Sequence, residues 1–191
     1  SRLKKGVLYG FSPPLIDADQ PTVAQFLQDQ GYATSVVGKW HLGLKWTELT
    51  EAEQRDRQAS PKDKQEAGWD IDYSQPAEGG PLSLGFTEDF LYPASLDMPP
   101  YVYLRNDRVV EVPTVTKSFK VPKRPGPSAA DFEASQCLDD FAREATDFIA
   151  RQSEAKRPFF LYLPLTSPHT PILPTERWQG QSGLGEYGDF V

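Results

Sequence analysis

The sequence contains the same order of elements twice, a helix followed closely by a strand, and this order constrains the fold more than any other feature. Residues 22–31 and Asp131–Gln152 carry apolar residues at three- and four-residue steps, which is typical of helices that cover a core. Tyr32–Val37 and Pro158–Leu163 follow them as apolar runs of strand length. Pro158–Leu163 is uninterrupted, so we expect a strand buried on both faces. The pattern predicts an α/β domain.

Each predicted strand runs into a polar loop that carries a histidine. His41 follows the first strand and His169 the second, and the chain has no other histidine. Ligands of open α/β sheets bind at the carboxyl ends of parallel strands, so these two loops are candidates for one site. The alternative is that each histidine is structural and bonds a nearby backbone group.

Lys39 and His41 are two residues apart. In an extended segment this spacing points both side chains to one side and Trp40 to the other. A lysine beside a histidine suits an anionic substrate, because the lysine supplies charge and the histidine moves a proton near neutral pH. On an exposed edge the same pair would have no function. His169 lies among prolines that restrict its backbone, which is also the composition of an ordinary turn.

The composition excludes several classes of protein. The chain has 191 residues and a formal net charge of −7, which suits one domain and argues against a nucleic-acid partner, since such a partner needs a basic surface. No apolar run approaches the ~20 residues of a membrane span. Cys137 is the only cysteine, which excludes an internal disulfide and a cysteine-rich zinc site. The chain begins with Ser1 and shows no leader, so we expect an interior piece of a longer protein.

The middle of the chain gives weaker signals. Within one domain over residues 1–191, we expect residues 44–80 and 96–130 to be loops or insertions. Residues 51–66 are highly charged, so we expect a solvated helix or an excursion loop there, and residues 75–81 have the composition of a loop. We expect a hairpin over residues 101–112 and a proline-rich surface loop over residues 113–130.

Three aspartates are weaker candidates for binding a metal ion or sugar hydroxyls. They are Asp70, Asp72 and Asp97, and solvated loop carboxylates are the alternative for each. The sequence contains no glycine-rich phosphate loop, no His-Glu-x-x-His and no Gly-x-Ser-x-Gly.

Several segments together resemble one enzyme family. Residues 31–43, with the sequence Gly-Tyr-Ala-Thr-Ser-Val-Val-Gly-Lys-Trp-His-Leu-Gly, resemble the second signature of the type I, formylglycine-dependent sulfatases. Residues 158–171 resemble the later family strand that ends in a Pro-His-x-Pro loop. Residues 84–95 resemble the Gly-Phe stretch that brings in a sulfate-contacting serine. The resemblance spans essentially the whole chain and is closest to the arylsulfatase branch.

The resemblance implies an alkaline-phosphatase-like domain, with a mixed, mostly parallel sheet flanked by helices, that is incomplete at both ends. It implies a sulfuric ester hydrolase that cleaves a sulfate monoester to an alcohol and sulfate. It also implies two cofactors, a formylglycine made from a Cys/Ser-x-Pro-Ser-x-Arg cassette and a divalent cation, usually calcium. Neither the cassette nor the metal ligands are expected in this chain, because Ser1-Arg2 does not continue as the cassette does and Leu138 and Asp139 follow Cys137. We therefore expect the fragment alone to be inactive, with no metal ligand of its own.

The resemblance also implies roles for four residues. Lys39 would hold the sulfate and the formylglycine oxygen, and Ser95 would donate to a sulfate oxygen. His41 would act as the base on the formylglycine, and His169 would bind near the bridging oxygen and help to protonate the departing alcohol. Lys39, His41 and His169 are thus the expected catalytic residues, and Lys39, Ser95 and His169 the expected substrate-binding residues.

Two other functions remain open on the sequence. One is a phosphate or phosphonate monoester hydrolase of the same superfamily, and the other is a non-catalytic, anion-binding sulfatase relic. The expected partner is a sulfated small molecule or saccharide. The family resemblance implies a periplasmic, secreted or lysosomal protein.

Overall fold

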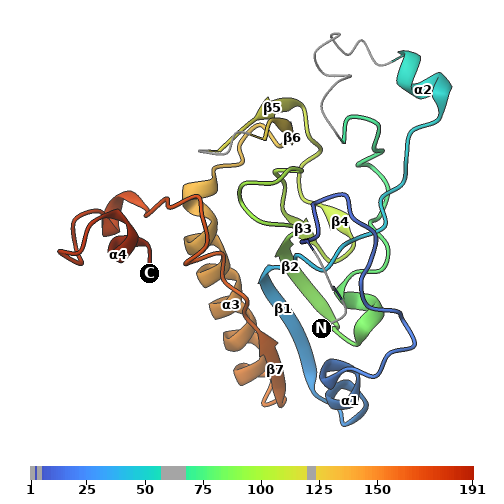
Figure 1. The fold of residues 1–191 in the computed structure, drawn as a ribbon. Helices are drawn as coiled ribbons and strands as arrows, with labels where there is room; N and C mark the ends of the chain where they lie inside the picture. The colour runs from blue at the N-terminus through green and yellow to red at the C-terminus, as the bar shows by residue number, and fades with distance from the viewer. Residues whose placement is uncertain (1–2, 4–5, 57–67, 120–123) are drawn as a thin grey trace.

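The computed structural model describes residues 3, 6–56, 68–119 and 124–191 (Figure 1). The helices are α1 (Val23–Asp29), α2 (Glu51–Asp56), α3 (Cys137–Glu154) and α4 (Glu186–Phe190), with 3-10 turns η2 (Pro81–Leu84), η3 (Ala134–Gln136) and η4 (Glu176–Trp178). The strands are β1 (Ala33–Lys39), β2 (Glu88–Tyr92), β3 (Leu104–Arg105), β4 (Arg108–Val109), β5 (Val115–Lys117), β6 (Gly126–Ser128) and β7 (Phe159–Tyr162).

In the part of the chain that the structure describes, one five-stranded sheet has the order β4-β3-β2-β1-β7. The longer strands are parallel, because β1 pairs in parallel with both β2 and β7. The short strands β3 and β4 extend the sheet in antiparallel fashion. The sheet is therefore mixed, with a parallel centre, and the α/β prediction is confirmed.

Helices cover both faces of β1. Val36 packs with Ala24 of α1, whereas Val37 belongs to the large core cluster that includes Phe141 and Ala145 of α3. Successive side chains of a strand point to opposite faces, so α1 and α3 lie on opposite sides of the sheet. Figure 1 shows α3 running alongside the sheet, with α1 at the other side of β1.

The first predicted helix begins as its sequence indicates. Thr22 is the N-cap, and its side chain accepts a hydrogen bond from the backbone N–H of Gln25. The sequence predicts that Val23, Phe26 and Leu27 share the face that covers the core. This expectation is wrong, because Val23 and Phe26 are exposed and Ala24 is the buried residue. The small Ala24 lets the helix approach the sheet closely.

The third helix begins later than predicted. The expected helix over Asp131–Gln152 is observed as α3 from Cys137, because Phe132 and the η3 turn precede it and lie against the core. Phe132 packs against the rings of Tyr92, Tyr101 and Tyr103. This aromatic cluster fixes the turn that leads into α3.

The expectation for the second strand is wrong in one respect. β7 lies at an edge of the sheet, and its outer residues Phe159 and Tyr162 are 36% and 45% exposed. It is therefore not buried on both faces. An apolar run predicts a strand, but it does not show which neighbours that strand has.

The middle of the chain is more ordered than a set of loops. Residues 96–130 include the β3–β4 hairpin at the expected place, and β5 pairs with β6 across the segment expected as a surface loop. Buried side chains in this stretch include Leu96, Tyr101 and Val102. Within residues 44–80, α2 covers the start of the expected solvated helix, and residues 57–67 lie outside the described residues.

Candidate active site

The loop after β1 is held between the ends of two neighbouring strands. The backbone N–H of Lys39 donates to the carbonyl of Pro164 (2.6 Å), just after β7. The N–H of Trp40 donates to the carbonyl of Tyr92 (2.8 Å), and that of His41 to the carbonyl of Pro93 (3.1 Å). These bonds bring the carboxyl ends of β1, β2 and β7 together, as a site at the end of a parallel sheet requires.

Gly38 is needed where β1 meets the end of β7. Its φ is +134°, and a Cβ at this position would lie 2.1 Å from the carbonyl oxygen of Pro164. A larger residue would clash with backbone that has no room to move. The glycine in the Gly-Lys-Trp-His sequence therefore lets the Lys39 backbone reach Pro164.

The side chains that follow the three strands form a chain of contacts. Lys39 Nζ lies 3.3 Å from Ser95 Oγ, and Ser95 Oγ lies 3.1 Å from His169 Nδ1. Lys39 ends β1, Ser95 follows β2 and His169 follows β7. The structure thus brings together three residues that are up to 130 positions apart in the sequence.

The partners of these groups assign their protons. The Lys39 ammonium can only donate, so Ser95 Oγ accepts its bond. His169 Nδ1 lies 2.7 Å from the carbonyl oxygen of Thr170, which can only accept, so Nδ1 carries a proton. Ser95 Oγ therefore accepts from Lys39 and cannot donate to the protonated His169 Nδ1, so its own hydroxyl hydrogen is left to donate to an anion.

His41 is held by a backbone carbonyl. Its Nε2 lies 2.7 Å from the carbonyl oxygen of Leu8, so Nε2 donates and the neutral ring has its lone pair on Nδ1. Its φ of 52° is uncommon for a residue other than glycine. Burial lowers the pKa of His41, the positive charges of Lys39 and His169 lower it further, and the Leu8 carbonyl and Asp97 oppose the change. The ring is therefore a neutral proton acceptor at neutral pH.

Asp97 is the negative charge of this region. Burial lowers the pKa of Lys39, and the charge of Asp97 opposes that change. Asp97 is 6% exposed and its Oδ2 forms an ion pair with Arg124 (3.0 Å). It therefore balances the cationic side chains of the site from a fixed, buried position.

The other two candidate aspartates differ from Asp97. Asp72 accepts hydrogen bonds from the backbone N–H and hydroxyl of Ser74, which is a local turn. Asp70 is exposed. Among the described residues, no three or more His, Cys, Asp or Glu side chains are placed to hold a metal ion. The described residues thus do not fit the expected cation.

Cys137 is not placed to act as a nucleophile. It is fully buried, Tyr103 donates a hydrogen bond to its sulfur (3.0 Å), and burial raises the pKa of its thiol to about 12. It therefore stays protonated and packs in the core.

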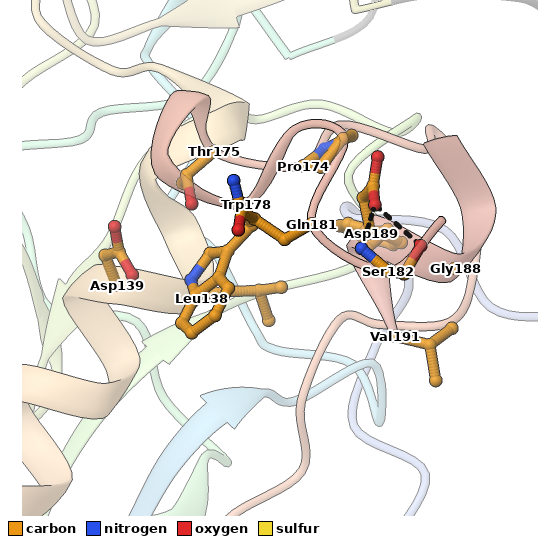
Figure 2. A pocket seen from close by; sticks show the side chains of 11 residues that line it. Leu138, Asp139, Pro174, Thr175, Trp178, Gln181, Ser182, Gly188, Asp189 and Val191 are labelled. Carbon is orange, nitrogen blue, oxygen red and sulfur yellow. Dashed lines mark hydrogen bonds between the residues drawn. The ribbon is translucent and has the colours of Figure 1, made fainter. Parts of the chain in front are cut away.

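A separate cavity of about 400 Å³ lies between the start of α3 and the C-terminal segment (Figure 2). Asp189 accepts hydrogen bonds there from the backbone N–H groups of Gly180 and Ser182 and from the Ser182 hydroxyl. These bonds satisfy the carboxylate and close the loop.

A membrane-spanning helix is not found in the described part of the chain, because no helix there has the length and apolar character that a span requires.

Sequence reasoning missed part of this arrangement. The Leu8 carbonyl that fixes the His41 tautomer has no sequence signal, because every residue carries a carbonyl. Ser95 was expected only through the family resemblance. Asp97 was one of three candidate aspartates, and it alone of the three is buried.

Comparisons with known proteins agree on one family. The model of the Sulfatase family matches residues 5–189. An N-acetylgalactosamine-6-O-sulfatase from Bacteroides thetaiotaomicron is 29% identical over 97% of this chain and 39% of its own length. An N-acetylgalactosamine-6-sulfatase from Canis lupus familiaris is 26% identical over 92% and 27%, and arylsulfatase G from Homo sapiens is 25% identical over 97% and 33%. The chain thus spans well under half of the length of these relatives.

Solved structures show the same fold. One from a study of the metabolism of multiple glycosaminoglycans by Bacteroides thetaiotaomicron has a TM-score of 0.73 and 26% identity, covering 99% of this chain and 42% of that one. The PsFucS1 sulfatase from Pseudoalteromonas sp. has a TM-score of 0.57 at 16% identity, covering 96% and 34%. The fold is therefore the alkaline-phosphatase-like fold of the sulfatases, and the chain belongs to the sulfatase family.

Proposed function

We propose that the protein hydrolyses a sulfate monoester to an alcohol and sulfate, with Lys39, His41, Ser95 and His169 in its active site. The observation that carries this proposal is the continuous contact from Lys39 through Ser95 to His169, beside a neutral His41. A sulfate ester needs donors for its oxygens and a proton for its leaving oxygen, and these residues supply both.

Each residue has a distinct task. The Lys39 ammonium and the Ser95 hydroxyl bind sulfate oxygens, because both present hydrogens from neighbouring positions. His169 donates through Nδ1 to Thr170, so Nε2 is the ring nitrogen left for the departing alcohol, and it can give that alcohol a proton only from the imidazolium form of the ring. His41 accepts a proton at Nδ1, because Leu8 occupies its Nε2–H.

The substrate class that we propose is a sulfated saccharide. Several relatives are named for N-acetylgalactosamine 6-sulfate, and they match nearly the whole of this chain. On the same family grounds we propose formylglycine and a divalent cation, calcium by family precedent, as cofactors, and a periplasmic, secreted or lysosomal location. The residues described here do not supply the cofactors.

The test compares several esters as substrates of the intact, full-length protein. Release of sulfate is measured from N-acetylgalactosamine 6-sulfate and 4-nitrophenyl sulfate, beside release of phosphate from 4-nitrophenyl phosphate and of 4-nitrophenol from a phosphonate monoester. We expect sulfate release to exceed the other rates, and Ser95→Ala to lower it.

Two outcomes would contradict the proposal. Faster hydrolysis of phosphate or phosphonate esters would identify a monoester hydrolase of the same superfamily. Binding of sulfate without turnover of any ester would identify an anion-binding relic. Faster hydrolysis of the aryl sulfate than of the sugar sulfate would agree with sulfate ester hydrolysis but contradict a saccharide as the substrate.

A further inference from the structure

A second cavity, of about 390 Å³, lies on the sheet face away from α3. Asp89 of β2 lines it, and the next residue, Phe90, packs on Phe141 of α3, so Asp89 points to the opposite face. The other walls come from residues 76–83 and from the turn between β3 and β4. Apolar side chains form much of the lining, including Leu44, Leu91 and Leu104.

The carboxyl group of Asp89 is buried inside the protein. Asp89 is 3% exposed, and among the described residues neither of its carboxyl oxygens has a hydrogen-bond partner. Its backbone is satisfied, because the Asn106 side chain accepts from its N–H and the N–H of Asn106 donates to its carbonyl. A buried carboxyl group without a donor is costly, and such groups in native proteins are normally paired.

The charged neighbours of Asp89 are engaged elsewhere. Glu78 forms an ion pair with Lys45 (2.6 Å), and Arg105 forms one with Glu144 (2.6 Å). Asp107, whose side chain is 48% exposed, lies at the rim near Arg108. The cavity therefore has a buried acidic floor, apolar walls and further carboxylates at its mouth, and within residues 6–56, 68–119 and 124–191 no cationic side chain forms an ion pair with Asp89.

We infer that this cavity binds a small organic cation, a primary ammonium on a short aliphatic body, with the Asp89 carboxylate as its anchor. An ammonium supplies the N–H donors that the two carboxyl oxygens lack, and the aliphatic body suits the leucine walls. A bare metal ion fits less well, because it needs several oxygen ligands and the described residues form no group of three or more.

The inference is independent of the proposed hydrolysis. Lys39 and Ser95 lie at the carboxyl ends of the strands, whereas Asp89 lies near the start of β2 on the face away from α3. Burial raises the pKa of Asp89 to about 8, the backbone N–H of Asn106 and the charge of Arg105 oppose the rise, and Asp107 and Glu88 add to it. A bound ammonium would favour the ionised carboxylate and lower that pKa.

The test uses n-butylammonium as the probe, with n-butanol as its neutral match and tetramethylammonium as a cation without N–H donors. Thermal stability of the intact protein is measured near pH 8 against the concentration of each compound. We expect a saturable rise in Tm with n-butylammonium alone. Asp89→Asn should weaken the apparent affinity at least tenfold, and Asp107→Asn should weaken it less.

A second variant protects the test against a folding defect. Leu82 lines the cavity and is 37% exposed, so Leu82→Lys places an ammonium of the chain itself at the cavity. It should abolish the response to n-butylammonium while the protein remains folded. An equal response in wild type and Asp89→Asn, an equal effect of n-butanol or tetramethylammonium, or no saturable response in the wild type would each overturn the inference.

Discussion

Replacement of Asp89 by asparagine should change how the stability of the protein depends on pH. Asp89 is buried, its carboxyl oxygens have no hydrogen-bond partner in the described part of the chain, and burial raises its pKa from 3.8 to about 8. Between these two values the folded protein holds a proton that the unfolded chain releases. Stability that depends on this proton is therefore fully present at low pH and is lost as the pH rises toward 8.

The shift sets the size of the effect. One pKa unit corresponds to about 1.4 kcal/mol, so the linked proton costs about 4 kcal/mol of stability near pH 7 and about 2 kcal/mol near pH 5. Asparagine has nearly the same shape and does not titrate. Its amide is also buried, which offsets part of the absolute gain, so the difference between the two pH values, about 2–3 kcal/mol, is the sharper quantity.

The assay is denaturant unfolding of wild type and Asp89→Asn at several pH values from 5 to 8. The free energy of unfolding of the variant, relative to wild type, should rise with pH by about 1 kcal/mol per unit. Asp107→Asn is the matched control, because its side chain is half exposed and should leave the pH slope nearly unchanged. Parallel pH curves for wild type and Asp89→Asn would refute the reasoning, because Asp89 would then be ionised and stabilised by groups that the structure does not show.

Three further results are expected. Lys39→Ala should lower kcat/KM for a sulfate ester by about 100-fold. Trp40→Phe should leave turnover nearly normal and lower the free energy of unfolding by about 1–2 kcal/mol. Equal losses of activity in the two variants would contradict the role of the lysine. Because the pKa of His41 is lowered, its ring stays neutral as the pH falls, so kcat/KM should be retained to a pH below the ordinary pKa range of histidine. His41→Gln should lower the rate and remove the fall in kcat/KM at acidic pH. An unchanged pH profile would exclude His41 as the base. Gly38→Ala should cost about 3 kcal/mol or more in denaturant unfolding, because its Cβ meets the Pro164 carbonyl, and a normal midpoint would show that β1 and β7 separate easily.

The parts of the fold that the sequence predicts are those with local signals. β1 contains the β-branched residues Thr34, Val36 and Val37, and the helix before it begins at a capping threonine, so both were expected near their observed places. α3 was expected from its periodicity, although its first turn was placed too early. These signals depend on neighbours in sequence, which a single sequence displays directly.

The parts that escaped prediction depend on tertiary contacts. β2 lies between β1 and β3 and is mostly buried, yet it begins with Glu88 and Asp89. Two acidic residues at its start are not typical of a buried strand, so the strand was not predicted. The exposure of β7 follows from its place at the sheet edge, which an apolar run does not encode. Asp89 itself has no signal in the sequence, because nothing about a lone aspartate indicates that its carboxyl group is buried and unpaired.

The candidate site combines both kinds of information. Lys39, His41 and His169 could be predicted because each follows a predicted strand, and the structure brings them to one place. Ser95 was named only through the resemblance, since the strand before it was not recognised. Their roles in sulfate hydrolysis remain a proposal.

The central claim is that Lys39 and Ser95 act together on one sulfate group, and a double-mutant cycle tests it most directly. The measurement is kcat/KM for a sulfate ester with wild type, Lys39→Ala, Ser95→Ala and the double variant of the intact protein. Because Lys39 Nζ lies 3.3 Å from Ser95 Oγ, we expect the two losses to overlap, with a coupling energy above about 1 kcal/mol. Losses that add fully, or single variants with wild-type kcat/KM, would contradict the claim that these residues bind one substrate group.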